Sequence, residues 1–315
     1  MLKVVFFGTP VFAAKVLKYL LEHQINVAAV ITKPDRPKGR SGQPLPTPVK
    51  LIAQEVKIPC FQPEIVSDPA FAPILAEFQA ELFVVVAYGE IIKQHLLDMP
   101  KRGCINLHGS LLPAYRGAAP IQRAILNGEK TTGITIMHMV KKMDAGEMIK
   151  IVEVPIGPDA IFPEIEEKLC QEGSKALLDV IRSLEKGKVL CTPQDHEKAT
   201  YAPKIELEEC EIDWKLPAQD IHNLIRAVVP EPGAWCFVTI KGEIKRLKIF
   251  RSKIIEVSGS PGAIVSYGKK GLLVACGEQA IEILELQLEG KKAMKAEDLM
   301  RGIQQDQISF IKISS

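Results

Sequence analysis

The sequence predicts an α/β protein: a doubly wound, mostly parallel, Rossmann-like sheet followed by a small C-terminal β-barrel of the OB type. Two observations lead to this fold class. In the first half of the 315 residues, short strands that are apolar throughout alternate with helical patterns, as in a parallel sheet covered on both faces. In the last third, short apolar runs are separated by glycine-containing turns, as in small barrels.

Each element of the α/β half has a local signal. Four mostly apolar segments, the first of them broken only by Lys3, are the expected parallel strands, and two later segments are expected to pair with each other. The helices follow from apolar spacings of three and four residues and, at Thr47-Pro48, from an N-cap followed by proline. The predicted strands are 2–7, 27–31, 82–87, 104–107, 133–139 and 148–154, and the predicted helices are 12–21, 48–56, 118–126 and 164–184.

A change of composition divides the chain. Residues 189–208 contain prolines and many charges with little periodicity, so we expect a linker there, between an N-terminal domain at 1–188 and a barrel domain at 209–315. The barrel strands are expected where apolar runs stand between Lys-Gly, Gly-Ser-Pro-Gly and Gly-Glu turns. These runs are 236–240, 244–250, 262–265, 272–276 and 281–288.

Composition excludes several classes of protein. The net charge of +2 does not by itself indicate a nucleic-acid partner. The seven cysteines are odd in number and form no Cys-x-x-Cys pair, which argues against a disulfide framework and a cysteine zinc site and fits a reducing cytosol. We find no secretion signal and no apolar run of roughly 18 residues. We therefore expect a cytoplasmic protein that does not bind a membrane.

The first strand is followed by Gly8-Thr9-Pro10, which departs from the dinucleotide-binding fingerprint. Pro10 occupies the position where a second glycine would let a pyrophosphate approach the backbone. The sequence therefore disfavours NAD binding.

Asn106 and His108 stand at the end of the fourth apolar strand, two residues apart and so on one face. An amide can donate to a developing oxyanion, and an imidazole can carry a proton near neutrality. Asp144 is the best candidate to orient that imidazole. Because no serine or cysteine nucleophile accompanies the three, the substrate must supply the nucleophile, and acyl transfer to an amine fits. A merely structural His108 remains open, and we interpret His138 as structural.

The motifs around these residues identify a resemblance that covers almost the whole chain. The sequence resembles the methionyl-tRNA formyltransferase family of the folate-dependent formyltransferases. The wider group shares the Asn–His–Asp set and the segment 110–113, whereas the loop at 33–40 and the C-terminal domain narrow the resemblance to the tRNA enzymes. The motifs are Phe7-Gly8-Thr9-Pro10, KPDRPKGR at 33–40, VVAYG at 85–89, NLHGSLLP at 106–113, YRGAAPIQ at 115–122, Met143-Asp144-x-Gly146, TYAPK at 200–204, IDW at 212–214 and GKKAM at 290–294.

The resemblance implies that the formyl group of N10-formyltetrahydrofolate is transferred to the α-amine of methionine on initiator tRNA. Asn106 would then donate to the oxyanion, His108 would carry a proton from the amine to the departing nitrogen, and Asp144 would hold the imidazole. The folate pocket would be lined by Ser110, Leu111, Leu112 and Pro113, opposite Val86, Ala87, Tyr88 and Gly89. Core packing remains open for the two leucines. No grouping of residues has metal-ligand spacing, so we expect no metal.

The resemblance also makes 1–188 the catalytic domain and 209–315 a tRNA-binding domain. Basic residues of the loop and of the barrel are the expected tRNA contacts, although a solvated charged loop remains open. They are Arg36, Lys38, Arg40, Lys245, Arg246 and Lys248. We expect a monomer whose partners are folate and initiator methionyl-tRNA. The alternatives are a folate-dependent formyltransferase acting on a purine precursor or an amino sugar, and a non-enzymatic RNA-binding protein.

Overall fold

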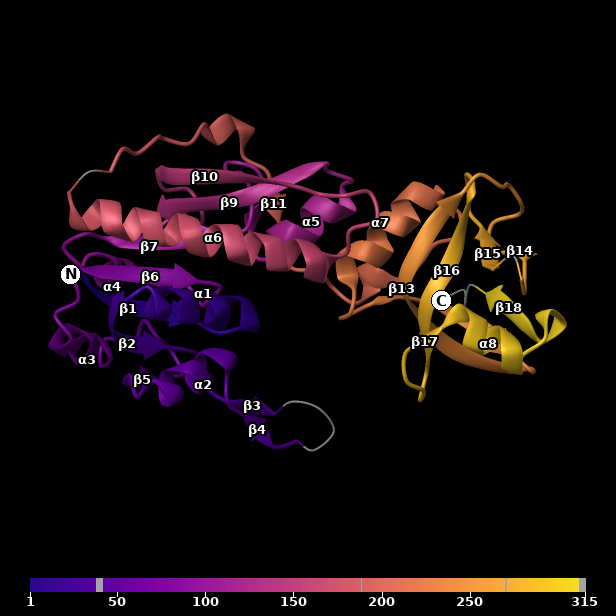
Figure 1. Cartoon of the computed structure of the whole chain (residues 1–315), viewed down its shortest axis with the longest axis horizontal. Helices are drawn as coiled ribbons and strands as arrows, with labels where there is room; N and C mark the ends of the chain where they lie inside the picture. Colours follow the sequence, from indigo (N-terminus) through magenta and orange to yellow (C-terminus); the bar gives the residue numbers. More distant parts are fainter. Residues whose placement is uncertain (38–41, 188, 270, 312–315) are drawn as a thin grey trace. The chain divides into compact units, whose positions relative to one another are not determined.

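The computed structural model describes residues 1–37, 42–187, 189–269 and 271–311 of the chain (Figure 1). The chain folds into two compact units. Unit 1 comprises residues 1–120, 131–155 and 166–203, and unit 2 comprises 121–130, 156–165 and 204–315. The units are therefore interleaved along the sequence, whereas the predicted division was a single linker at 189–208 between contiguous domains.

Unit 1 is built on a seven-stranded sheet with the order β10-β9-β7-β6-β1-β2-β5. The five strands from β7 to β5 are parallel, and β9 and β10 are antiparallel to their neighbours. This arrangement confirms the predicted doubly wound, mostly parallel sheet. The strands are β1 Lys3–Gly8, β2 Asn26–Ile31, β5 Cys60–Phe61, β6 Leu82–Val86, β7 Cys104–His108, β9 Thr131–His138 and β10 Met148–Pro155.

The strand order reverses between β1 and β6. From β1 the chain proceeds outward through β2 to β5, then returns to place β6 on the other side of β1 and proceeds outward again to β7. In open α/β sheets, ligands bind beyond the carboxyl ends of the strands at such a reversal. The expected site therefore lies near Gly8, Val86 and His108, the last residues of β1, β6 and β7.

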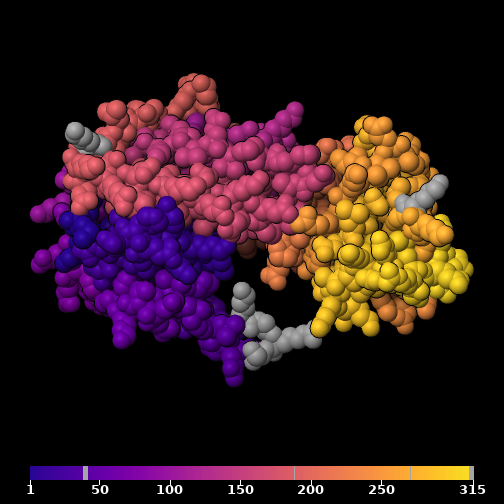
Figure 2. All heavy atoms as spheres, in the orientation of Figure 1, coloured from indigo at the N-terminus to yellow at the C-terminus, as the bar shows by residue number. Residues whose placement is uncertain are grey.

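Helices cover the sheet and follow their predicted positions closely. In α2 the Thr47 hydroxyl accepts a hydrogen bond from the Lys50 amide at 3.1 Å, as the N-cap signal predicts. Helices α1 and α6 lie side by side in Figure 2, and Lys15 of α1 pairs with Glu167 of α6. The helices are α1 Val11–Glu22, α2 Pro48–Glu55, α3 Ala72–Glu77, α4 Gln94–Leu97, α5 Pro120–Leu126 and α6 Phe162–Glu185. The sequence analysis missed the short α3 and α4.

The segment 189–203 packs within unit 1. Its strand β11 (Tyr201–Ala202) pairs with β8 (Arg116–Gly117), and Thr192 forms an isolated bridge to Met148. The 3₁₀ turn η1 (His196–Lys198) lies between them. Residues that read as linker in the sequence thus form part of the structure next to the predicted site.

Unit 2 contains a nearly closed antiparallel barrel, as predicted. Its strand order is β14-β15-β16-β13-β12-β18, with β17 paired to β16. The strands are β12 Ala234–Ile240, β13 Glu243–Ile255, β14 Ile264–Ser266, β15 Leu272–Ala275, β16 Ala280–Leu288, β17 Met294–Lys295 and β18 Ile308–Ile311. The remaining elements, which the sequence analysis missed, are the helices α7 Ala218–Val228 and α8 Ala296–Gly302, the 3₁₀ turns η2 Glu208–Cys210 and η3 Gln305–Gln307, and, in unit 1, the short hairpin β3 Arg36–Pro37 and β4 Pro44–Leu45.

None of the helices in the described ranges combines the length and the apolarity that crossing a bilayer requires.

Candidate active site

Asn106 lies two residues before the last residue of β7, between Val85 of β6 and Met137 of β9. Its side chain is half-buried, and its amide makes no hydrogen bond to any group of the described residues. Because its strand neighbours leave the amide unpaired at the expected edge of the sheet, Asn106 can donate to an atom of a bound ligand.

His108, the last residue of β7, is buried, with both ring nitrogens facing protein groups. Nε2 lies 2.9 Å from the Tyr115 carbonyl oxygen. Because a carbonyl can only accept, Nε2 carries the proton and Nδ1 of the neutral ring is bare. Nδ1 lies 3.7 Å from Oδ2 of Asp144. That distance is too long for a direct hydrogen bond.

Asp144 occupies the turn between β9 and β10. Its Oδ2 accepts a hydrogen bond from the Gly117 amide at 2.8 Å, and its backbone is left-handed, with φ of 50°. Non-glycine residues adopt that conformation only when their surroundings impose it. The structure therefore brings the three residues predicted to act together into one region of unit 1.

Gly146 of the Met143-Asp144-x-Gly146 motif lies against the backbone at the end of β9. A Cβ atom at this position would stand 1.7 Å from the carbonyl oxygen of His138, an atom that cannot move away as a side chain can. The motif therefore requires glycine because the Asp144 turn packs directly on the end of β9.

We predict that Gly146→Ala lowers the free energy of unfolding by about 1–3 kcal/mol, since the turn must shift to admit the methyl group. Urea denaturation measures this change. Gly157→Ala is the matched control, because its Cβ would meet only Ala160 Cβ at 3.6 Å. Equal stability of the two variants would contradict the close packing of the turn.

The loop after β7 is held by its own polar groups. The Ser110 hydroxyl donates to the Ala114 carbonyl at 2.6 Å, and the Thr135 hydroxyl donates to the Ser110 carbonyl at 2.7 Å. Thr135 also accepts from the Leu112 amide at 3.1 Å, while the Leu112 side chain packs with two methionines. The side chains of Ser110 and Leu112 thus hold the loop, whereas Leu111 and Pro113 are part-exposed. The sequence analysis missed Thr135.

The segment predicted to face this loop, Val86 to Gly89, turns sharply at the end of β6. Ala87 and Gly89 are exposed and both have positive φ, 45° and 84°. The Tyr88 ring is buried and meets Phe7 edge-on, with centroids 5.7 Å apart. Burial raises the pKa of the Tyr88 hydroxyl above its usual value. A ligand here would meet the backbone around Ala87 and Gly89 rather than the Tyr88 side chain.

The basic loop that begins at Lys33 is anchored by acids at its base. Lys33 pairs with Glu90 at 2.7 Å, and Lys50 pairs with Asp35 at 2.6 Å. Lys50 and Gln62 hold the pKa of Asp35 below its ordinary value. Arg36 is exposed and lies 3.8 Å from Glu64. Lys38 and Arg40, the other predicted contacts of this loop, lie outside the described residues.

The predicted basic residues of the barrel face two directions. Arg246 lies opposite Phe237, and Lys248 lies opposite Trp235, so these four share one face of β12 and β13. Trp235 is buried on this face, and the other three are half-buried. The Arg246 guanidinium stacks over the Trp235 ring at 4.5 Å from its centroid. Lys245 belongs to the alternate set of β13 and pairs with Glu243 at 2.8 Å. We call Trp235, Phe237, Arg246 and Lys248 the barrel face.

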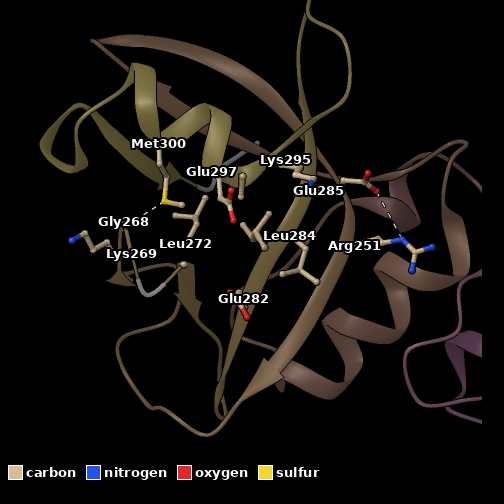
Figure 3. A pocket seen from close by; sticks show the side chains of 13 residues that line it. Arg251, Gly268, Lys269, Leu272, Glu282, Leu284, Glu285, Lys295, Glu297 and Met300 are labelled. Atoms are coloured by element: carbon tan, nitrogen blue, oxygen red, sulfur yellow. Dashed lines mark hydrogen bonds and ion pairs between the residues drawn. The ribbon is translucent and has the colours of Figure 1, made fainter.

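Unit 2 also contains a cavity of about 580 Å³, shown in Figure 3. Its lining includes charges of both signs: Arg251, Lys269, Lys295, Glu282, Glu285 and Glu297. None of the predicted site residues lines it. Within the described residues, no group of three or more His, Cys, Asp or Glu side chains is arranged to hold a metal ion.

Comparisons with known proteins show the family to which the chain belongs. Residues 2–181 match the model of the formyl transferase family, and residues 204–304 match that of the formyl transferase C-terminal domain. The chain is 59% identical to methionyl-tRNA formyltransferase of Protochlamydia amoebophila over 98% of each chain. It is 45% identical to that of Chlamydia abortus, over 96% of this chain and 95% of the relative.

A solved structure shares the fold. The N-formyltransferase from Helicobacter canadensis, in complex with folinic acid and dTDP-3-aminofucose, superimposes with a TM-score of 0.64 at 20% identity. The match covers 90% of this chain and 99% of that one. At this identity the likeness concerns the fold alone.

Proposed function

Because the chain belongs to the methionyl-tRNA formyltransferase family, whose enzymes formylate methionyl-tRNA for translation initiation, we propose that Asn106, His108 and Asp144 are its catalytic residues. The donor we propose is N10-formyltetrahydrofolate, and the acceptor is the α-amine of methionine on initiator tRNA. One observation carries the assignment: an unpaired amide and an imidazole stand two residues apart at the end of β7, with a carboxylate 3.7 Å from the imidazole.

The reaction does not need a strong base to deprotonate the attacking amine. An α-amine has a pKa of about 7.7–8.0, and esterification of the methionine carboxyl lowers this pKa further, so a neutral amine is available near pH 7 to attack the formyl carbon without a strong base. A C–N bond then forms to the amine, and the bond from the formyl carbon to the folate nitrogen breaks. The Asn106 amide donates to the formyl oxygen as it gains negative charge. His108 moves one proton from the amine to the departing nitrogen.

The proton is exchanged at Nε2 of His108. Nδ1 faces Asp144, so it is not the nitrogen that meets the substrate. Nε2 now donates to the Tyr115 carbonyl, and we propose that the substrate replaces this carbonyl as its partner. The ring proton then moves to Nδ1, beside the Asp144 carboxylate, and leaves Nε2 bare to accept the proton of the amine. Asp144 stabilises the imidazolium that exists between uptake and release of the proton.

For the donor we propose a pocket between the loop 110–113 and the segment 86–89. The exposed backbone at Ala87 and Gly89 supports this placement, because a flat ring can approach a backbone that carries small side chains. Leu111 and Pro113 would face it from the other side. Ser110, Leu112, Val86 and Tyr88, whose side chains are buried, would shape the pocket from behind.

For the tRNA we propose the barrel face together with Arg36, Lys38 and Arg40, of which the last two lie outside the described residues. Among the described residues, neither Arg246 nor Lys248 forms an ion pair with an acid, so both cations are available to phosphates. Aromatic rings beside such cations are typical of surfaces that bind RNA. Lys245, paired with Glu243, is expected to contribute less.

We predict that Arg246→Ala and Lys248→Ala each weaken tRNA binding and lower the slope of log K against log salt by about 1, because each removes one phosphate contact. Filter binding at several salt concentrations measures the slope. Lys175→Ala is the control, since Lys175 lies on α6 and pairs with Glu172 at 2.7 Å. An unchanged slope in both barrel variants would remove the barrel face from the interface.

We place the reaction in the cytoplasm, where translation starts, and all seven cysteines are free, as is usual in a reducing compartment. We expect the enzyme to act as a monomer. The function is tested by incubating the protein with labelled N10-formyltetrahydrofolate and methionylated initiator tRNA. Label should appear in formyl-methionine released from the tRNA. Label transferred instead to an amino sugar or a purine precursor, with none on the tRNA, would contradict the proposed acceptor.

A further inference from the structure

Gln194 lies in the segment that the sequence analysis treated as linker, and its side chain is buried against the site. Its Nε2 donates to the carbonyl of Asp144 at 2.9 Å and to the carbonyl of Gly146 at 2.7 Å. Both hydrogens of the amide are therefore used to bind the two sides of one turn, the turn that carries the Asp144 carboxylate.

The oxygen of the same amide also forms hydrogen bonds. Its Oε1 accepts from Nη2 of Arg116 at 2.5 Å and from Nε at 3.2 Å. Arg116 is 1% exposed and is itself held by Nδ1 of His196 at 2.9 Å from Nη2. Gln194 thus connects a fixed guanidinium to the Asp144 turn.

The turn needs such support. Asp144 is left-handed, with φ of 50°, a conformation that costs energy for a residue with a Cβ. Its carboxylate accepts from the Gly117 amide, and Gly117 adjoins Arg116 in the loop that also supplies the Tyr115 carbonyl to His108. Gln194 therefore ties together the two loops that set the distance between Asp144 and His108.

We propose that Gln194 is a positioning residue for formyl transfer: it holds the Asp144 turn so that the carboxylate faces Nδ1 of His108. This inference rests on the proposed role of Asp144. A displacement of about 1 Å at a catalytic group can lower a rate by about 10²-fold. Gln194 touches no reacting atom, so its effect must pass through Asp144.

Gln194→Met keeps the length of the side chain and removes every hydrogen bond of the amide, including the weak one from Nε2 to the Met137 sulfur. We expect kcat for methionyl-tRNA to fall by at least about tenfold, with KM for both substrates within about twofold of the wild type. In an Asp144→Asn background, the same change should lower kcat by less than about twofold, because the carboxylate it positions is already absent. A tenfold loss in both backgrounds would show an independent effect and overturn the proposal.

The Gln194→Glu variant separates the contribution of the side-chain oxygen from that of the side-chain N–H groups. It can still accept from Arg116, but it has no N–H to give to the carbonyls of Asp144 and Gly146. We expect it to lose as much kcat as Gln194→Met, and wild-type kcat in this variant would overturn the proposal. Gln171→Met is the control, since Gln171 is exposed on α6 and donates only to Glu167, at 3.1 Å.

A measurement without catalysis distinguishes this inference from the proposed function. The Ala145 amide donates to the Lys142 carbonyl at 3.3 Å within the Asp144 turn. In both Gln194 variants this amide should lose protection from hydrogen exchange, while the amides of β1 keep theirs. Unchanged protection at Ala145 would overturn the positioning role. Absence of formyl transfer by the wild-type protein, with protection lost in the variants, would instead reject the proposed function alone.

Discussion

Replacing Asn106 with alanine is expected to lower kcat by about 10²–10³-fold while leaving the affinity for tRNA near that of the wild type. The amide is unpaired within the described protein and stands at the end of β7, so it is free to donate where the formyl oxygen gains charge. That charge is absent from the ground state, and the loss should therefore be in kcat rather than in KM. Single-turnover kinetics with saturating donor measure it.

Asn26→Ala is the control for this change, because Asn26 is an exposed asparagine at the start of β2. It should retain wild-type kcat. The thermal midpoints of both variants should lie close to that of the wild type, since neither side chain packs in the core. Wild-type turnover by Asn106→Ala would exclude the amide as the oxyanion donor.

Replacing His108 with alanine is expected to lower kcat by about 10²–10⁴-fold. Among the residues of the candidate site in the described part of the chain, only this imidazole has a carboxylate near its Nδ1. Its Nε2 is the proposed proton carrier. Without it, the proton of the attacking amine must leave through water. The tRNA affinity, which depends on phosphate contacts elsewhere, should change by less than about twofold.

His138→Ala is the matched control for this second change. His138 ends the neighbouring strand β9, opposite Ile105 of β7, and burial lowers the pKa of its imidazole. A variant at this half-buried ring should keep kcat within about twofold of the wild type. If the two histidine variants lost the same amount of activity, His108 would have no special part in proton transfer.

The candidate site was predictable where its residues follow from strand geometry. An apolar run predicts β7, and the alternation of side chains along a strand places Asn106 and His108 on one face. The parallel sheet predicts the edge at which they stand. The structure also places Asp144 beside the imidazole. In the sequence, Asp144 was only the best candidate to orient the ring, supported by the resemblance.

Other positions could not be predicted because they depend on distant contacts. Lys33 begins the basic loop, yet it pairs with Glu90, 57 positions away in the chain. Tyr88 was expected to face the donor, yet the left-handed Ala87 interrupts the alternation of β6 and its neighbour turns into the core. Neither the number of charges in a segment nor the alternation of side chains along a strand reveals the Lys33–Glu90 pair or the burial of Tyr88.

By itself the sequence determined the two architectures, the order of the major strands and helices, and the pair of polar residues at the end of β7. These depend on apolar periodicity and on turn residues, which are local properties. Only the tertiary structure decided that Gln194 supports the Asp144 turn, that Nε2 of His108 is the protonated nitrogen, and that Arg246 and Lys248 share a face from which Lys245 is turned away. Those facts depend on hydrogen bonds and strand registers between segments far apart in the chain, for which a single sequence carries no periodic signal.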